Sequence, residues 1–444
     1  MIRRLISLTT AILLLAGNMT NNNAASLVGD FRKDTGCKAV SAVIYSKGEE
    51  DHYGESDALY QIGSMTKAFT GLAIQKLIDE GRLAKDDTVD RYIEGFEVFF
   101  DSQKVSITVD DLLSQKSGFT NSEKDYPSAT EDMTLIEWAN SMSGKELKCK
   151  PGTEYNYSNA NFDLLGAMIE KITGLSYRDY MIGEILTPLG LYDTYVGVPE
   201  TKDRIIEGSR LCYRTPLEYS VPVREGSIPA GYFYSSGKDM SRWLKIWLGD
   251  EQIDTEFVLA IEHIKYNLKE EGDYYAGWEL FENGVIGHSG GTPNYSSRIV
   301  FSDKDDTGVC VLTNLNVAAS TDSLCNGIFE RACGRADTGI VCDIWTVFDK
   351  IFTAVTVGGI FIAVVLLIIR NKRALLITGV VIAVLVALMV ILFPIIFGAG
   401  LKDILLVWAP WSMAGGMLIL LADIAVAILR LCSVRVNESR KKTS

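Results

Sequence analysis

The stretch Leu59–Gly81, LYQIGSMTKAFTGLAIQKLIDEG, decides the fold of this chain because it runs from a short apolar segment directly into a helix. Apolar side chains recur at helical spacing until Gly81, a residue type that commonly ends helices. Ser64 and Lys67 lie three positions apart at the start of that helix, so one turn places both side chains on one face. A serine hydroxyl is a weak nucleophile until a base takes its proton, and a partly desolvated lysine is such a base. Ser64-Met65-Thr66-Lys67 is therefore a candidate nucleophile and base. The alternative, which this short motif alone does not exclude, is an exposed serine and lysine at a helix start.

A second motif, Tyr157-Ser158-Asn159, directly precedes a predicted helix that begins near Ala160. A tyrosine phenol transfers protons when nearby cations lower its pKa, and an asparagine amide can hold a substrate carbonyl. We therefore expect Tyr157 to assist Lys67 in catalysis and Asn159 to bind substrate. The alternative is an ordinary polar loop that caps the helix.

A third motif, His288-Ser289-Gly290-Gly291, opens a glycine-rich turn and a predicted strand. Glycine lets a substrate backbone approach closely, and the N–H of Gly291 is a candidate oxyanion donor together with the helix-start N–H of Ser64. His288, Ser289 and Gly290 are the predicted substrate-binding residues of this motif. The alternative is a lone surface histidine beside a turn.

Strand patterns occur at both ends of the first three quarters of the chain, with helical patterns between them. Residues 37–60 alternate apolar and polar around glycine-containing turns, which predicts a hairpin. Ser296–Phe301 and Gly308–Thr313 predict two more strands, followed by a helix over Ala318–Ala332. Helical pieces broken by Gly, Pro and Ser fill residues 90–243. This order predicts one α+β domain, with an antiparallel sheet built from both ends, flanking helices and a mainly helical region.

The last quarter of the chain is far more apolar and contains three segments long enough to cross about 30 Å of hydrocarbon as helices. They are Ile351–Ile369, Ala374–Phe397 and Ile404–Leu429. Basic residues gather between the first two segments and after the third, and positive charge favours the cytoplasmic side of a membrane. We therefore expect three transmembrane helices that contact membrane lipid as an anchor, with the preceding domain on the extracytoplasmic side of the cell membrane.

The first residues, MIRRLISLTTAILLLA, combine a basic start with an apolar run that is short for crossing a bilayer. Small residues at Ala24-Ala25 offer a cleavage point, so a secretory signal peptide is expected, with an uncleaved anchor as the alternative. The expected organisation is a signal peptide over 1–25, a domain over 26–345, a three-helix transmembrane region over 346–430 and a basic cytoplasmic tail over 431–444.

Charge and residue usage exclude several functions. The chain of 444 residues has a formal net charge of −13 and no Lys/Arg-rich stripe to neutralise phosphates, so we expect no nucleic-acid partner. Its three histidines form no HxH or HExxH motif and its eight cysteines form no CxxC pair, so we expect no metal site and no cofactor. Most cysteines are expected to be small buried apolar residues. No sequence feature identifies a protein partner.

Together, in this order, the three motifs resemble the signature of the serine β-lactamase and penicillin-binding superfamily, which joins SxxK, Tyr-x-Asn and a KTG-type strand. The similarity to the class C β-lactamase-like branch extends to longer segments, namely Ile107–Phe119, Tyr157–Thr194, Ile228–Trp243 and Gly287–Asn314. It covers nearly all of residues 37–335 and implies the fold of that branch, with Ser64 as the nucleophile and Lys67 as its base.

Two positions depart from the pattern of that branch. His288 stands where its β-lactamases usually have lysine, and members with histidine there include esterases, D-amino-acid peptidases and D-Ala-D-Ala carboxypeptidases. Efficient antibiotic hydrolysis is therefore not expected. Gln115 stands where relatives often have histidine, which we interpret as a structural change. An exported domain of this branch followed by three spans also resembles membrane peptidases that remove an N-acyl-D-amino-acid cap from nonribosomal peptide precursors.

The resemblance implies a serine hydrolase that forms an acyl-enzyme on an amide or ester without a cofactor. We expect the substrate to be a small D-amino-acid-containing peptide, either a cell-wall peptide or a capped precursor. An esterase is one alternative. A second is a β-lactam or peptidoglycan sensor that is acylated without efficient turnover, and a third is an inactive binding module.

Overall fold

The computed structural model describes residues 24–443 except 124, 201 and 338, with side chains described as far as residue 433. The predicted signal peptide therefore lies almost entirely outside the described residues. The chain divides into two compact units. The sheet unit comprises the residues up to Ser209 and Tyr219–Val341, and the apolar unit comprises Arg210–Glu218 and the residues from Cys342 onward. The sequence patterns did not indicate that Arg210–Glu218 would group with the C-terminal helices.

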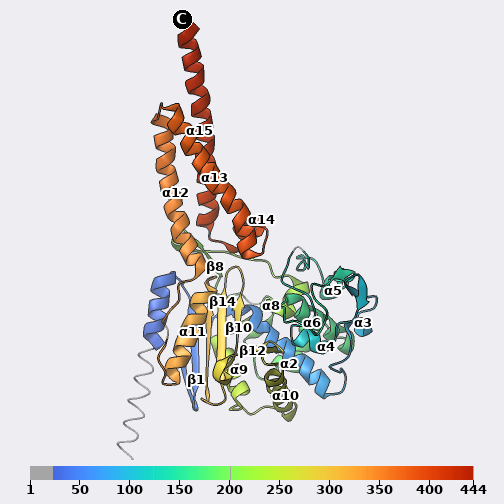
Figure 1. The fold of residues 1–444 in the computed structure, drawn as a ribbon. Helices are drawn as coiled ribbons and strands as arrows, with labels where there is room; N and C mark the ends of the chain where they lie inside the picture. The colour runs from blue at the N-terminus through green and yellow to red at the C-terminus, as the bar shows by residue number, and fades with distance from the viewer. Residues whose placement is uncertain (1–23, 124, 201, 338, 444) are drawn as a thin grey trace, which may run out of the picture. The chain divides into compact units, whose positions relative to one another are not determined.

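The sheet unit is built on an antiparallel sheet that includes β1, β12 and β14 (Figure 1). The strand order is β11-β12-β13-β14-β15-β1-β2. Its strands are β1 (Val40–Ser46), β2 (Glu49–Gly54), β11 (Tyr274–Tyr275), β12 (Trp278–Leu280), β13 (Ile286–Gly291), β14 (Ser296–Ser302) and β15 (Thr307–Thr313). In the pairing of β1 with β15, Val40 lies opposite Thr313. The two ends of the unit therefore meet within one sheet, which confirms the predicted hairpin and the two predicted C-terminal strands.

Helices cover both faces of this sheet, because every residue of β14 and β15 is buried. α11 (Ala318–Ala332) packs against β14 and β15, whereas α9 (Gly237–Leu248) packs against β15 and β1. The rings of Trp243 on α9 and Phe69 on α2 (Thr66–Asp79) stack with their centroids 4.1 Å apart. Burying a large apolar side chain of this kind contributes about 1.5–3 kcal/mol. This packing fixes α2, the helix that carries Lys67, against the sheet layer.

The mainly helical region is centred on α6 (Asn159–Thr173), which is buried over residues 160–169. α6 packs against α2, α4 (Val109–Leu113), α5 (Leu135–Ser141) and α8 (Ile228–Gly231). α4 and α5 both begin with capping boxes, which satisfy otherwise unpaired helix-start N–H groups. The other elements of the unit include α3 (Val89–Tyr92), β4 (Val98–Phe100), β5 (Gln103–Val105), β6 (Lys145–Glu146), α7 (Tyr177–Tyr180), η2 (Met181–Leu186), η3 (Glu225–Ser227), α10 (Thr255–Glu271) and η4 (Glu282–Gly284).

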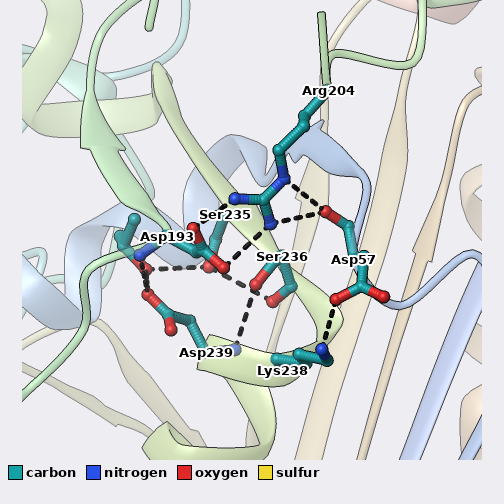
Figure 2. A network of polar contacts seen from close by, with 8 residues as sticks. Asp57, Asp193, Arg204, Ser235, Ser236, Lys238 and Asp239 are labelled. Atoms are coloured by element: carbon teal, nitrogen blue, oxygen red, sulfur yellow. Dashed lines mark hydrogen bonds and ion pairs between the residues drawn. The ribbon is translucent and has the colours of Figure 1, made fainter.

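A second, small antiparallel sheet leads the chain into α2. It consists of β3 (Leu59–Gln61), β10 (Phe233–Ser236) and β7 (Thr194–Val196). Figure 2 shows the polar network that ties its strand ends together. The Arg204 guanidinium donates to the Asp193 carboxylate at 2.8 Å and to the backbone carbonyl of Asp57. Asp239 accepts hydrogen bonds from the Asp193 N–H and the Thr194 hydroxyl, both at 2.8 Å.

In the described part of the chain, three helices of the apolar unit are long and apolar enough to cross a membrane. They are α12 (Ile344–Ile368), α13 (Lys372–Phe397) and α15 (Trp411–Thr443), and α15 packs against the other two. The predicted start of the third segment at Ile404 was wrong. Two short helices, α14 (Leu401–Asp403) and η5 (Ile404–Trp408), precede the span, which begins only at Trp411. Pro410 explains the break, because it lacks an N–H and holds Ala409 in an extended conformation with ψ of 156°.

The buried Arg210 side chain closes the carbonyl end of η5. It lies on β8 (Ser209–Cys212), which forms a hairpin with β9 (Thr215–Glu218). Its guanidinium donates to the backbone carbonyls of Leu405 at 2.6 Å, Leu406 at 2.7 Å and Ala409. It also lies 4.4 Å from the ring centroid of Trp411. A helix that ends before a proline leaves its last carbonyls without N–H partners. The Arg210 guanidinium supplies the missing hydrogen-bond donors.

Candidate active site

Ser64 lies in η1 (Gly63–Met65), the single turn between β3 and α2. Gly63 has a φ of +54°, in the left-handed region that favours glycine. A Cβ atom at Gly63 would also lie only 2.6 Å from the amide nitrogen of Gly291. Glycine is therefore required on both counts, and it lets β13 pass directly beside the turn that carries Ser64.

Lys67 is fully buried on the first turn of α2. Its Nζ donates to Oγ of Ser64 at 3.0 Å, to Oδ1 of Asn159 at 2.8 Å and to the backbone carbonyl of Ala230. Burial lowers the pKa of Lys67 to about 7, while the negative charge of Asp163 opposes the shift. A large fraction of Lys67 is therefore a free amine near neutral pH, and a free amine can accept the proton of the Ser64 hydroxyl.

Tyr157 contacts both of these residues. Its hydroxyl makes a hydrogen bond with Ser64, and Nζ of Lys67 lies 5.1 Å from the centroid of its ring. Burial raises the pKa of Tyr157 above its ordinary value. The expectation that nearby cations lower this pKa is therefore wrong, because desolvation of the phenol outweighs the charges around it. Tyr157 is therefore a neutral phenol near neutral pH.

Gln115 holds the loop that carries the second motif. Its Oε1 accepts hydrogen bonds from the Ser158 N–H at 2.8 Å and from Nδ2 of Asn161, and its backbone carbonyl accepts the Asn156 N–H at 2.8 Å. Gln115 itself is fully buried, with a φ of +59°. These contacts support the structural interpretation of Gln115, since they fix the start of α6 and so place Asn159 beside Lys67.

The two glycines of the third motif bring β13 against the nucleophile turn. A Cβ atom at Gly290 would lie 2.0 Å from the carbonyl oxygen of Ile62, so a larger residue would force the strand away. The Ser297 hydroxyl on β14 donates to the same carbonyl at 2.8 Å. These contacts lock the turn before Ser64 to the sheet.

One edge of β13 is open next to the site. Among the described residues, β12 pairs with β13 only at Ile286 and Gly287, so the following four residues have no strand partner on that side. An open strand edge can pair with an extended peptide backbone. The amide nitrogen of Gly291 lies beside Gly63, the residue that precedes Ser64.

The His288 side chain lies inside the protein and not on this open edge. It is 2% exposed, and burial together with the Lys67 charge lowers the pKa of His288 to about 3. The imidazole is therefore neutral, and its Nδ1–H donates to the Ser289 carbonyl at 2.6 Å. Its ring lies 6.1 Å from the Tyr157 ring between centroids. His288, which the sequence predicts to bind substrate, thus packs against Tyr157.

The Ser289 side chain lies on the opposite face of β13, as strand alternation requires. Its hydroxyl donates to the Asp322 carboxylate, 3.0 Å from each oxygen, and accepts from the Arg298 guanidinium at 2.8 Å. The structure therefore does not bring this hydroxyl to Ser64, and a role for Ser289 in substrate binding would depend on its backbone.

Asp163 on α6 belongs to the site but was not singled out from the sequence. Its Oδ1 accepts the Ala230 N–H at 3.0 Å, and the Ala230 carbonyl in turn accepts Nζ of Lys67. Burial raises the pKa of Asp163 well above its ordinary value, and the charge of Lys67 opposes that shift. The available signal was its position four residues after Asn159, which places both side chains on one face of a helix.

This arrangement can carry out acyl transfer. It provides a serine nucleophile, a buried amine base, a phenol on the same hydroxyl and two backbone N–H groups for an oxyanion. Within the described residues, no group of three or more His, Cys, Asp or Glu side chains is placed to hold a metal ion.

A family model described as Beta-lactamase matches residues 24–326 of the chain. Among curated proteins, Protein flp of Staphylococcus aureus is 33% identical over 268 residues, which are 58% of this chain and 53% of that protein. Penicillin-binding protein 4* of Bacillus subtilis is 28% identical over 282 residues, which are 58% of this chain and 60% of that protein. The chain thus spans little more than half the length of these curated relatives.

A solved structure with the same fold is the β-lactamase/D-alanine carboxypeptidase of Pseudomonas syringae. The two chains superpose with a TM-score of 0.61 at 17% identity, covering 72% of this chain and 99% of that one. At this identity the likeness concerns the fold alone. Together with the sheet order, these matches confirm the predicted class C-like α+β fold followed by three apolar helices.

Proposed function

Because this chain belongs to the β-lactamase family, we propose that it is a membrane-anchored serine hydrolase that acts through an acyl-enzyme on Ser64. One observation carries the proposal: Nζ of Lys67 lies 3.0 Å from Oγ of Ser64, and the pKa of this buried amine is lowered to about 7. Covalent acyl transfer needs at least a nucleophile in direct contact with a base whose pKa lies near the working pH.

In the acylation step, Lys67 takes the hydroxyl proton of Ser64 while Oγ attacks the substrate carbonyl carbon. The negative charge that develops on the carbonyl oxygen is stabilised by the N–H groups of Ser64 and Gly291, and losing one such donor typically costs about 10²–10³ in rate. Collapse of the tetrahedral intermediate breaks the bond to the leaving nitrogen or oxygen. That atom receives a proton from Tyr157, which regains one from Lys67.

In the deacylation step, a water molecule attacks the ester that Ser64 has formed. Its proton passes to the Lys67 and Tyr157 pair, and the departing Oγ of Ser64 is reprotonated. The acyl group leaves as a carboxylic acid, so atoms balance without a cofactor. Asn159, whose Oδ1 accepts Nζ of Lys67 at 2.8 Å, holds the acyl carbonyl side of the substrate in this proposal.

We propose a D-amino-acid-containing peptide as the substrate, either a cell-wall peptide or an N-acyl-D-amino-acid-capped precursor. The open edge of β13 supports a peptide, because an extended backbone can pair with it. Two similar proteins also support it, since one is named a penicillin-binding protein and the other a β-lactamase/D-alanine carboxypeptidase.

We place this hydrolase on the extracytoplasmic side of a cell membrane, with three spans as its anchor. The support is the cluster Arg370–Arg373 between α12 and α13 and the basic residues after Leu429, since positive charge favours the cytoplasmic side.

The test uses the full chain in detergent or in membranes. A fluorescent penicillin or a fluorophosphonate is expected to label the wild type. It is expected to label Ser64→Thr poorly or not at all, and not to label Ser64→Ala. The exposed Ser176→Thr variant is the matched control and is expected to be labelled like the wild type. Equal labelling of Ser64→Ala would contradict the mechanism.

Substrate class is then resolved by turnover of D-Ala-D-Ala peptides, N-acyl-D-amino-acid amides, short esters and a chromogenic cephalosporin, with the L-amino-acid peptides as stereochemical controls. Turnover of the D-peptides above the L-peptides supports the proposal. Turnover of esters alone indicates the esterase. Stoichiometric acylation without turnover of any compound indicates a sensor.

A further inference from the structure

Asp163 reaches Lys67 through a single peptide group. Ala230 is the third residue of the short helix α8, so its N–H has no partner within that helix. Oδ1 of Asp163 accepts this N–H at 3.0 Å, and the Ser227 hydroxyl also bonds to Asp163. The carbonyl of the same residue, Ala230, accepts Nζ of Lys67. The carboxylate therefore determines where one of the three acceptors of the catalytic amine lies.

Asp163 is also the buried carboxylate that acts electrostatically on Lys67. Its side chain is 2% exposed, and burial raises its pKa well above the ordinary value, a shift that the Lys67 charge opposes. The negative charge of Asp163 in turn raises the pKa of Lys67, so each group favours the charged form of the other. The other titratable groups that face Lys67 are uncharged near neutral pH: the pKa of His288 on β13 is lowered to about 3, and the pKa of Tyr157 is raised.

The groups that face Asp163 from other elements carry little compensating charge. Burial raises the pKa of both Tyr177 on α7 and Tyr232 after α8, so both phenols are neutral. Glu123, in the loop before α5, is the other carboxylate that acts on Asp163. The Ser128 N–H and hydroxyl bind that carboxylate at 3.0 and 2.6 Å. Lys67 is thus the cation that responds to Asp163.

We propose that Asp163 is a positioning residue for Lys67, holding the Ala230 peptide in place and supporting the ammonium form with its negative charge. This inference rests on the proposed function, because it assigns a role within the same acylation step. It adds a residue that lies outside the SxxK motif, the Tyr-x-Asn motif and the glycine-rich motif.

The two parts of this role have opposite effects on rate and can be separated. Asp163→Asn keeps an oxygen that can accept the Ala230 N–H but removes the charge. Without the charge the ammonium of Lys67 is less stable, so Lys67 loses its proton at a lower pH. A nearby opposite charge typically shifts a pKa by about 1–3 units. A downward shift of about one unit raises the free-amine fraction at pH 6 from about one tenth to about one half, so acylation there becomes about 5-fold faster.

Asp163→Ala removes both the charge and the acceptor. The Ala230 peptide then loses its support, the base is misplaced, and acylation is expected to fall by about 10-fold or more at every pH. A purely structural role would slow both variants at all pH values. The faster acylation of Asp163→Asn at acidic pH is the signature that distinguishes positioning with charge support from loss of structure.

The experiment measures the rate of Ser64 labelling by a fluorescent penicillin, between pH 5 and 9, on the full chain. The matched control is Asp239→Asn, which removes another buried carboxylate of the sheet unit, one that binds the Thr194 hydroxyl and not the Ala230 peptide. Its pH midpoint is expected to equal that of the wild type. Thermal unfolding of each variant shows that the labelled protein is folded.

Three results would overturn the inference. An Asp163→Asn midpoint equal to or above the wild-type midpoint shows that the carboxylate does not support the ammonium. An equal downward shift in Asp239→Asn shows that the effect is not specific to Asp163. Absence of labelling at Ser64 in the wild type would contradict the proposed function and the inference together. If the wild type is labelled and the Asp163 variants keep its rate and pH midpoint, only the inference is contradicted.

Discussion

A Cβ atom at Gly63 would lie 2.6 Å from the amide nitrogen of Gly291, although the two residues belong to distant parts of the sequence. The turn before the nucleophile and the end of β13 are therefore packed as closely as two backbones can be. This closeness places the backbone of Gly291 beside the turn that carries Ser64, and the proposed oxyanion hole uses the N–H groups of these two residues. It also makes a single methyl group at residue 63 a direct test of the site.

We expect Gly63→Ala to lower the acylation rate by at least about 10²-fold, because the added methyl pushes one oxyanion donor out of place. The measurement is the rate of labelling by a fluorescent penicillin. Gly174→Ala is the matched control, since Gly174 also has positive φ, +74°, but nothing lies within 4 Å of its added Cβ. That control should lose about 1 kcal/mol of stability and keep its rate. A wild-type rate in Gly63→Ala would contradict the packing.

The acylation rate is expected to fall about tenfold per pH unit below about pH 7. The pKa of Lys67 is lowered to about 7, and only the free amine can take the Ser64 proton. The pH dependence of folding stability that Lys67 contributes is opposite in sign to that of a lysine in an ion pair. Because the native state binds fewer protons than the unfolded state between about pH 7 and the ordinary lysine pKa near 10.4, folding stability gains as pH rises through that window. A rate that stays constant down to pH 5 would exclude Lys67 as the base.

Tyr157→Phe is expected to fold normally and to slow acylation by about 10²-fold or more, since only the hydroxyl that contacts Ser64 is removed. The acidic limb near pH 7 should persist in this variant because it belongs to Lys67. Labelling across pH 5–9 and thermal unfolding check both expectations. Disappearance of the limb in Tyr157→Phe would assign the base to the phenol instead.

Arg210→Ala is expected to lower the melting temperature of the apolar unit in the full chain. The carbonyls of Leu405, Leu406 and Ala409 lose their donor, and each buried unsatisfied polar group costs about 1–3 kcal/mol. Arg214→Ala is the control on the same hairpin, because the exposed Arg214 bonds Asp349 only through its backbone N–H. Unfolding is followed by circular dichroism in detergent. Equal melting of Arg210→Ala and the wild type would show that Arg210 does not stabilise the end of η5.

The proposed topology is tested with two native cysteines. Cys342 precedes α12 and Cys432 lies near the end of α15, and both are exposed. In intact cells, a membrane-impermeant thiol reagent should modify a variant that retains only Cys342 and spare one that retains only Cys432. Permeabilised cells, in which both should react, provide the control. The reverse pattern would place the hydrolase in the cytoplasm and exclude cell-wall peptides as substrates.

Local sequence determined much of the fold and the chemistry of the site. The spacing of Ser64 and Lys67 fixed their contact, because a helix brings residues three apart onto one face, and the structure places their polar atoms 3.0 Å apart. Two short strand-like segments joined by a polar turn likewise located β14 and β15, and the length of the apolar segments located the three spans. The start of the third span was missed because hydropathy does not register the break that Pro410 imposes.

Side-chain environments depended on tertiary structure. Alternation along a strand is visible in sequence, but which face meets the helical region is not, so only the fold showed His288 buried against Tyr157 and Ser289 turned toward Asp322. The pKa of Tyr157 was misjudged for the same reason. Desolvation depends on how much protein surrounds a group, and that is set by segments far away in the sequence.

The sequence by itself therefore determined that Ser64 and Lys67 would meet, because residue type and helical spacing are local properties. Only the tertiary structure decided how they are tuned. Asp163 reaches Lys67 through the Ala230 peptide of another helix, and Arg210 reaches the end of η5 from a distant hairpin. Such contacts join segments far apart along the chain, and neither periodicity nor motif spacing encodes which distant segments will meet.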